Sequence, residues 1–317
     1  MYNFCFMLKT YNQDIHAVDR LVKTFIKHNV ENIHLYIVIP KTDYDIFKKY
    51  ENDNISIVIE EKIDVCFFTE AVDGLSVGYL NQEICKLAFW KLNLCDNYCC
   101  LDSECYFIRD FYYKDFMYDE TTPYTVLFED KDLQVDYQYY KYFWKNREPY
   151  LEKIANSMEL NNHKILTCHG FQNMSKKALK SFEHNYLSKF GYTYKDIIKI
   201  APYEFSWYNL WLQKNKDIPI YICEPFFKTY HTQKQYWRDI FSGITEKDLA
   251  RSYVGIVING NFTPQNELVN YGDLPIKPNI QPQERMKIRH IILLMKLQLW
   301  QPILSIKGLI RLLKSKI

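Results

Sequence analysis

The sequence lacks several features that would place a chain in a well-known class. Its nine cysteines contain no CxxC pair and no spacing typical of a zinc finger. No uninterrupted apolar run approaches the roughly 20 residues that a membrane-spanning helix needs. The N-terminus has no basic segment followed by a long apolar run and a cleavage site, so we expect a strand there and not a signal peptide. An odd number of cysteines in a large domain favours a reducing compartment, and we therefore expect a cytoplasmic location.

Length and composition indicate a folded protein with a large core. The chain has 317 residues, of which 48% are hydrophobic and 17% aromatic, and this excludes disorder through lack of apolar surface. We expect one large domain, alone or with an appendage. Eight of the 40 basic residues lie from Arg285 onward, where no acidic residue occurs, and the preceding part is mildly acidic. Because no basic stripe runs through the predicted core, nucleic acid is not expected as the main partner.

Short apolar runs alternate with segments of helical periodicity. The runs that we expect to form buried strands are residues 2–8, 33–39, 55–59 and 98–101. The segments that we expect to form helices are residues 15–26, 43–50 and 80–92, followed later by 139–160 and 175–190. This alternation is typical of a doubly wound α/β sheet, so we predict an α/β fold.

Two carboxylates follow the fourth predicted strand. Asp102 and Glu104 lie one residue apart, between the run 98–101 and a second apolar run that begins at Cys105. Open α/β sheets bind ligands at the carboxyl ends of their strands, and carboxylate oxygens are the ligands that Mg²⁺ and Mn²⁺ prefer. Such an ion would neutralise a diphosphate leaving group. The alternative interpretation is an ordinary acidic turn in a β-hairpin.

A later polar segment offers further candidates. His231 could serve as a third metal ligand, because a neutral imidazole binds metal ions. Lys228 and Lys234 could neutralise phosphate as point charges. The alternative for all three residues is a solvated polar loop.

Two segments on the N-terminal side supply candidate contacts to a nucleotide. Lys9, Thr10 and Tyr11 follow the first predicted strand, where Tyr11 could stack on a base and Thr10 could hydrogen-bond to it. Gln82 and Lys86 are four residues apart and therefore share one face of the predicted helix that leads to the acidic pair. The alternative for this pair is the polar face of an ordinary amphipathic helix.

One carboxylate lies among aromatic residues. Glu204 belongs to the segment PYEFSWY (202–208), and burial against rings would raise its pKa and make it a candidate base for an acceptor hydroxyl. Trp207 and Tyr208 could face a sugar ring. The alternative is that Glu204 is a structural hydrogen-bond acceptor at the start of a helix.

Taken in order, these segments resemble glycosyltransferases of the GT-A type, and more closely a bacterial family of glycosyltransferase-like proteins known as a domain of unknown function. The resemblance spans roughly residues 1–265 and rests on LKTY (8–11), GYLNQEICKL (78–87), LDSECYFIR (101–109), YEFSWY (203–208) and YVGIVIN (253–259). It implies a GT-A-like Rossmann-type sheet with helices on both faces and a nucleotide-diphosphate sugar as donor.

The resemblance also assigns residues to the site. Asp102 and Glu104 stand in the place of the D-x-D metal motif, with Ser103 between them among the donor contacts. Glu replaces the second Asp that is usual in this motif, so Asp102 is the firmer ligand. His231 matches the C-terminal metal- or phosphate-contacting histidine of the similar family eight enzymes.

The C-terminal part differs in composition. Residues 259–284 are rich in Asn and Pro and are expected to form a linker after a catalytic domain of residues 1–258. In residues 285–317, apolar and basic residues interleave at roughly helical spacing around Trp300, which predicts an amphipathic tail that binds an anionic membrane surface. The alternative is a helix that packs on the body or mediates a homodimer. A membrane-associated enzyme would suit a lipid-linked or cell-surface glycan acceptor.

Two other functions fit parts of the pattern. A sugar nucleotidyltransferase also places metal-binding carboxylates on an α/β sheet, but the loop at residues 9–12 contains no glycine to cradle a phosphate. A non-catalytic protein of the same fold could use its aromatic residues to bind glycans.

Overall fold

The computed structural model describes residues 2–64, 66–127, 137–160, 167–168, 170–231, 235–236, 238–239 and 242–258. The predicted linker and tail, residues 259–284 and 285–317, lie outside the described residues, so the predictions made for them stay predictions. The chain divides into two compact units. The first comprises Met1–Thr229 and Leu249–Ile258, and the second comprises Tyr230–Asp248 and Asn259–Ile317.

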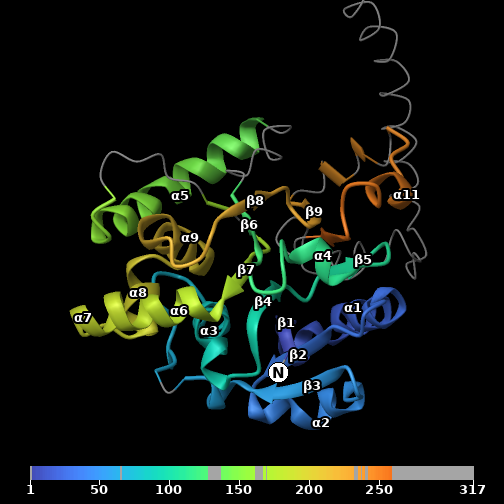
Figure 1. Cartoon of the computed structure of the whole chain (residues 1–317), viewed down its shortest axis with the longest axis horizontal. Coiled ribbons are helices and arrows are strands. Elements are labelled where there is room, and N and C mark those ends of the chain that lie inside the picture. The colour runs from blue at the N-terminus through green and yellow to red at the C-terminus, as the bar shows by residue number, and fades with distance from the viewer. Residues whose placement is uncertain are drawn as a thin grey trace, which may run out of the picture. The chain divides into compact units, whose positions relative to one another are not determined.

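A five-stranded sheet forms the centre of the first unit, in the order β3-β2-β1-β4-β7 (Figure 1). The strands are β1 (Tyr2–Lys9), β2 (His34–Ile39), β3 (Ile55–Ile59), β4 (Cys95–Leu101) and β7 (Asn173–Ser175). The first four run parallel to one another, and β7 is antiparallel to β4. The α/β prediction is therefore confirmed, and the four predicted strands correspond to β1–β4. The sequence did not predict β7.

Helices cover both faces of this sheet, as expected for a doubly wound fold. Helix α1 (Ile15–His28) follows β1, and α3 (Val77–Ala88) precedes β4; they lie on opposite sides of these two strands (Figure 1). Helix α1 buries Val18, Leu21, Val22 and Phe25, which recur at helical spacing. The hydroxyl of Ser76 accepts a hydrogen bond from the backbone N–H of Tyr79 and so caps α3.

The chain reverses its direction of winding between β1 and β4. From β1 it winds outward through β2 to β3, and it then returns through α3 to β4 on the other side of β1. Leu8 of β1 pairs with Leu101 of β4, so the two strands end side by side. This is the switch point at which open α/β sheets bind their ligands.

Two smaller sheets complete the strands. The first has the order β5-β10-β9, formed by β5 (Cys105–Phe107), β10 (Gly255–Ile258) and β9 (Phe227–Tyr230). The second pairs β6 (Tyr124–Val126) with β8 (Tyr221–Cys223). Because β5 pairs with β10 and β4 pairs with β1 and β7, the segment from Asp102 to Glu104 connects two different sheets. The alternative of a β-hairpin turn is therefore wrong.

The remaining helices include the three other predicted segments, 43–50, 139–160 and 175–190, together with four helices in the described part of the chain that the sequence did not predict. The longer ones are α5 (Tyr137–Ser157), α6 (Lys176–Phe182), α8 (Tyr194–Ile200) and α9 (Glu204–Asn215). The short ones are α2 (Tyr44–Phe47), α4 (Tyr113–Phe116), α7 (Ser188–Phe190) and α11 (Glu246–Leu249). A π-helical turn, Glu183–Leu187, joins α6 to α7. The 3₁₀ segments are Asn12–Asp14, Lys41–Asp43, Lys48–Tyr50, Glu60–Lys62 and Phe89–Leu92.

Two further features concern the cysteines and the helices. Cys5 of β1 and Cys95 of β4 are joined by a disulfide, which their spacing did not predict, and the other seven cysteines are thiols. Among the helices that the structure describes, none has the length and apolar character needed to cross a membrane.

Candidate functional site at the switch point

The loops that follow β1 and β4 contact each other at the switch point. Ser103 Oγ lies 2.9 Å from Thr10 Oγ1 and 3.0 Å from Asp14 Oδ2, and both hydroxyl-bearing residues are buried. The two loops are thereby joined through side chains as well as through the adjacent strands. The structure brings together Thr10, Ser103 and Asp102, which the sequence assigned to one site from segments far apart in the chain.

Three carboxyl groups gather at this point. Burial raises the pKa of Glu104 to about 7, and the negative charges of Asp102 and Asp14 act in the same direction. Burial also raises the pKa of Asp14, with Asp102 adding to the effect and the Ser103 hydroxyl and Lys9 opposing it. Burial, together with the neighbouring negative charges, therefore raises the pKa of Glu104 enough for it to hold a proton near neutral pH.

Asp14 is a site residue that the sequence did not reveal as one. It directly precedes α1, but its side chain makes no capping hydrogen bond to that helix and lies against Ser103 instead. The available signal was its location in the loop after the first core strand, at the same sheet edge as Asp102.

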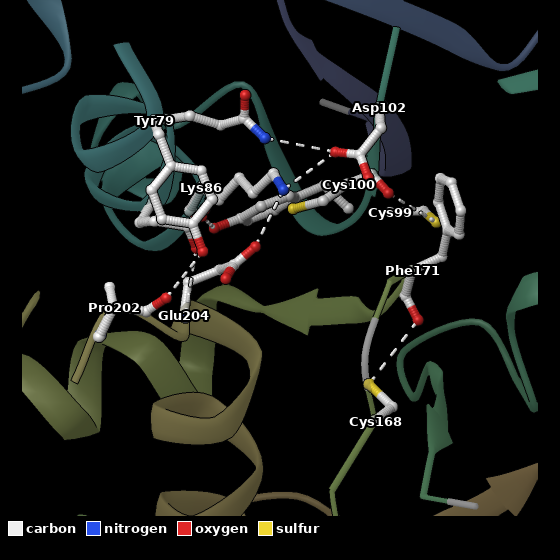
Figure 2. A network of polar contacts seen from close by, with 12 residues as sticks. Tyr79, Lys86, Cys99, Cys100, Asp102, Cys168, Phe171, Pro202 and Glu204 are labelled. Carbon is white, nitrogen blue, oxygen red and sulfur yellow. Dashed lines mark hydrogen bonds and ion pairs between the residues drawn. The ribbon is translucent and has the colours of Figure 1, made fainter. Parts of the chain in front are cut away.

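Lys86 connects the acidic loop to α9. Its Nζ lies 3.1 Å from Asp102 Oδ1 and 2.9 Å from Glu204 Oε1, and Gln82 Nε2 lies 3.4 Å from Asp102 Oδ1 (Figure 2). The predicted shared face of Gln82 and Lys86 thus points at the acidic pair. The lysine side chain is only 4% exposed, whereas that of Asp102 is 31% exposed. Asp102 is therefore the member of this group that a ligand can reach.

The pKa of Glu204 differs from the one expected from its aromatic neighbours in the sequence. Burial acts to raise its pKa, as expected from the aromatic neighbours, but the charge of Lys86 and hydrogen bonds from Glu83 and Lys86 outweigh burial, so its pKa is lowered. Glu204 is consequently a charged carboxylate at neutral pH. The role of base for an acceptor hydroxyl stays a prediction.

The aromatic neighbours of Glu204 do not line a sugar site. Trp207 and Tyr208 are fully buried, with Trp207 Nε1 donating to the Ala201 carbonyl and the Tyr208 hydroxyl accepting from the Ser175 N–H. The expectation that these two rings face a sugar is therefore wrong. They form part of the core between α9 and its neighbours because α9 is buried along its first nine residues.

The remaining predicted donor contacts differ in their surroundings. Lys9 is buried with Nζ 2.7 Å from Glu60 Oε2 and 3.0 Å from the Thr10 carbonyl oxygen, so its charge is already balanced. Tyr11 is 43% exposed, and burial together with Asp14 and Glu104 raises its pKa. Its ring is therefore accessible to a base.

Three further predicted residues come from the segment that follows β8. Lys228 is half-buried in β9 of the first unit. His231 belongs to the second unit, where its backbone N–H donates to Gln235 Oε1 over 2.8 Å. Lys234 lies outside the described residues. The roles of these three residues at the site stay predictions.

The switch point offers a metal ion some of the ligands that it needs. Asp102 and Glu104 supply carboxylate oxygens, and the repulsion that raises the pKa of Glu104 is what a divalent cation would relieve. Within the described residues, no group of three or more His, Cys, Asp or Glu side chains is arranged to hold a metal ion. Phosphate oxygens and water would be among the remaining ligands, as is common for Mg²⁺.

Fold and geometry together define an α/β protein with a cluster of carboxyl groups at the switch point of its sheet. The chain belongs to a family of unknown function, DUF6492, which it matches over residues 4–240. No curated protein matches its sequence. The resemblance to a family of unknown function is thereby confirmed.

Two solved structures are similar to this chain over most of its length. One is the WbbM bifunctional glycosyltransferase in its apo form, with a TM-score of 0.49 and 13% identity, covering 91% of this chain. This chain spans 52% of that protein. The other is mouse xyloside xylosyltransferase 1 in its apo form, with a TM-score of 0.41 and 9% identity, covering 83% of this chain and 99% of that one. Scores at this level do not by themselves assign an activity.

Proposed function

We propose that this protein is a metal-dependent glycosyltransferase that moves a sugar from a nucleotide-diphosphate donor to a hydroxyl of a cell-surface glycan or lipid-linked acceptor. The observation that carries the proposal is the meeting of Asp102, Ser103 and Glu104 with Thr10 at the switch point of the sheet. Partly buried carboxyl groups that repel one another at a ligand-binding position favour a cationic ligand.

In this proposal, Asp102 and Glu104 hold Mn²⁺ or Mg²⁺, and the ion supplies Lewis-acid stabilisation to the diphosphate leaving group. Tyr11, whose ring is exposed, stacks on the base, and Thr10 and Ser103 contact the nucleotide. Gln82 and Lys86 hold Asp102 in place, because both reach its Oδ1 atom. His231, Lys228 and Lys234 remain the proposed contacts to the metal or the phosphates.

The acceptor side of the proposal rests on Glu204. Its carboxylate is charged and lies on the other side of Lys86 from Asp102, which favours a role near the reacting hydroxyl. The predicted basic tail, residues 285–317, would hold the enzyme at an anionic membrane surface in the cytoplasm or join two copies.

Thermal denaturation with Mn²⁺ and UDP or GDP tests this proposal. A ligand at about 100 times its Kd stabilises the folded state by about 2.7 kcal/mol, which raises the Tm by several degrees in a chain of this size. We expect stabilisation that needs both Mn²⁺ and nucleotide and that is lost in Asp102→Ala. Asp45→Ala is the matched control, since Asp45 is an exposed carboxylate that pairs with the neighbouring Lys48.

The outcomes separate the alternatives. A screen of nucleotide sugars for metal-dependent donor hydrolysis then identifies the sugar. No response to any nucleotide would contradict the proposal and favour a non-catalytic glycan-binding protein. Release of pyrophosphate from a sugar phosphate and a nucleoside triphosphate would instead identify a sugar nucleotidyltransferase.

A further inference from the structure

The acidic side chain of α3, that of Glu83, faces Glu204, and the proposed function gives it no role. Glu83 is 2% exposed and Glu204 is 6% exposed, so both carboxyl groups are removed from water. The backbone N–H of Glu204 lies 3.4 Å from Glu83 Oε2, and the two side chains are also hydrogen-bonded to each other. The side chain of Glu83 therefore contacts both the backbone N–H and the carboxyl group of Glu204.

The charges around this pair do not balance if both carboxyl groups are ionised. Lys86 is the ammonium that Glu204 contacts, and it also pairs with Asp102. The titratable groups that face Glu83 are Glu204, Lys86, Tyr79, Tyr203 and Cys100. Two buried carboxyl groups in hydrogen-bonding contact cannot both carry a charge without a large cost, so such pairs share one proton.

The division of that proton follows from the neighbours. Burial, the charge of Glu204 and the hydrogen bond to Glu204 raise the pKa of Glu83 well above its usual range. The contact with Lys86 has the opposite effect on Glu204, whose pKa is lowered. Glu83 is therefore the carboxylic acid of the pair, and Glu204 is the carboxylate.

The contact also fixes the start of α9. Glu204 is the first residue of this helix, and the first N–H groups of a helix have no partner within it. Glu83 Oε2 accepts the hydrogen bond of one of these N–H groups. A single side chain of α3 thus orients both the first turn of α9 and the carboxylate that the turn carries.

We propose that Glu83 is a positioning residue, which shares a proton with Glu204 and holds that carboxylate against Lys86, so that Lys86 in turn holds Asp102. The chain of contacts runs from Glu83 through Glu204 and Lys86 to Asp102, and its last three members are seen in Figure 2. The functional part of this inference rests on the proposed glycosyltransferase activity. The protonation of Glu83 does not.

Infrared spectroscopy of the full chain tests the shared proton without any substrate. At pH 8, above the pKa of about 7 of Glu104, we expect the wild type to show the carbonyl band of a buried protonated carboxyl group. This band should be missing in Glu83→Gln and unchanged in Glu70→Gln, an exposed control. Persistence of the full band in Glu83→Gln would overturn the proposal.

Substitutions of Glu83 then show whether it acts on Glu204 as a neutral hydrogen-bond donor or as a charged group. Glutamine can still donate to Glu204, whereas leucine cannot. We expect Glu83→Leu to lower the Tm by about 3–8 °C and Glu83→Gln to recover most of that loss. If Glu83→Gln is as unstable as Glu83→Leu, Glu83 acts as a charge and the proposal fails.

Donor hydrolysis tests the link to Glu204. We expect Glu83→Leu to reduce kcat at least about tenfold with little change in the KM of the donor, and Glu83→Gln to restore most of it. In a Glu204→Gln background, Glu83→Leu should have no further effect on kcat. Full additivity would show that Glu83 does not act through Glu204. If the wild type hydrolyses no nucleotide sugar, the proposed function fails while the infrared and Tm results still decide the shared proton.

Discussion

The Nζ atom of Lys86 lies 3.1 Å from Oδ1 of Asp102, yet the lysine is almost fully buried and the aspartate is partly exposed. The cation therefore cannot leave the protein to follow a substrate, whereas the carboxylate can meet one. An arrangement of this kind orients a ligand-binding carboxylate from behind. It also makes the stability of the site depend on a single buried positive charge.

Replacing Lys86 should destabilise the fold strongly. Lys86→Met leaves Glu204 buried without its cation, and removing one partner of a buried pair costs about 3–5 kcal/mol. Urea denaturation measures this loss. Lys48→Met is the control, because the pair of Lys48 and Asp45 is exposed and solvent screening should leave it little effect on stability. A loss for Lys86→Met no larger than for Lys48→Met would contradict the buried network.

Stability should fall as pH rises through neutrality because of Glu104. Its pKa is raised to about 7 from a usual value of 4.5, so the folded state holds this proton more tightly than the unfolded state. The contribution of this proton to the free energy of unfolding is fully present below about pH 4.5. It is lost as pH rises through about 7, which lowers the free energy of unfolding by about 1–3 kcal/mol.

Urea unfolding at pH 5 and pH 8 with a chelator present checks this dependence. The difference in unfolding free energy between wild type and Glu104→Gln should change by the stated amount between the two pH values. Added Mn²⁺ should reduce the change if Glu104 is a ligand. Parallel pH profiles of the two proteins would rule out the raised pKa.

Removing the hydroxyl of Ser103 should weaken the contact between the two loops of the site. Ser103→Ala deletes the hydrogen bonds to Thr10 and Asp14, which should cost about 1–2 kcal/mol. We expect the stabilisation by Mn²⁺ and nucleotide to weaken as well. Ser56→Ala, which removes a hydrogen bond to His34 away from the site, should leave that stabilisation intact. Equal nucleotide responses in the two variants would argue against Ser103 at the site.

A methyl group at Gly255 should disrupt the three-stranded sheet. A Cβ at this position would overlap the Phe227 ring and the Tyr106 carbonyl oxygen, and such overpacking costs about 1–3 kcal/mol or more. Gly78→Ala is the matched control in α3, where a Cβ would meet no neighbour within 4 Å and alanine favours the helix. Thermal denaturation should show a lower Tm for Gly255→Ala and an equal or higher Tm for Gly78→Ala. The opposite order would contradict the close packing of β10.

Local pattern was sufficient to predict the sheet and the place of the acidic pair. Apolar runs and helical spacing located β1–β4, α1 and α3, because each depends only on neighbours along the chain. The alternation of strands and helices also placed Asp102 at the carboxyl end of β4. The shared face of Gln82 and Lys86 followed from the helix repeat alone.

The side-chain contacts that set the charges and orientations at the site could not be predicted from local pattern. Glu204 meets Lys86 from 118 residues away, and Ser103 meets Asp14 from 89 residues away. Sequence periodicity shows which face of an element is buried, but it does not show which two faces pack together. For that reason the sequence alone does not show that the aromatic residues beside Glu204 belong to the core and not to a sugar-binding surface.

The sequence by itself determined the α/β order of elements and the position of Asp102, Ser103 and Glu104 at a strand end. Tertiary structure alone decided that this segment joins two sheets, that Asp14 lies beside it, and that Glu83, Glu204 and Lys86 form one buried group. The physical reason is that the charge state and orientation of a buried carboxyl group depend on its neighbours in space, and packing of distant segments selects those neighbours.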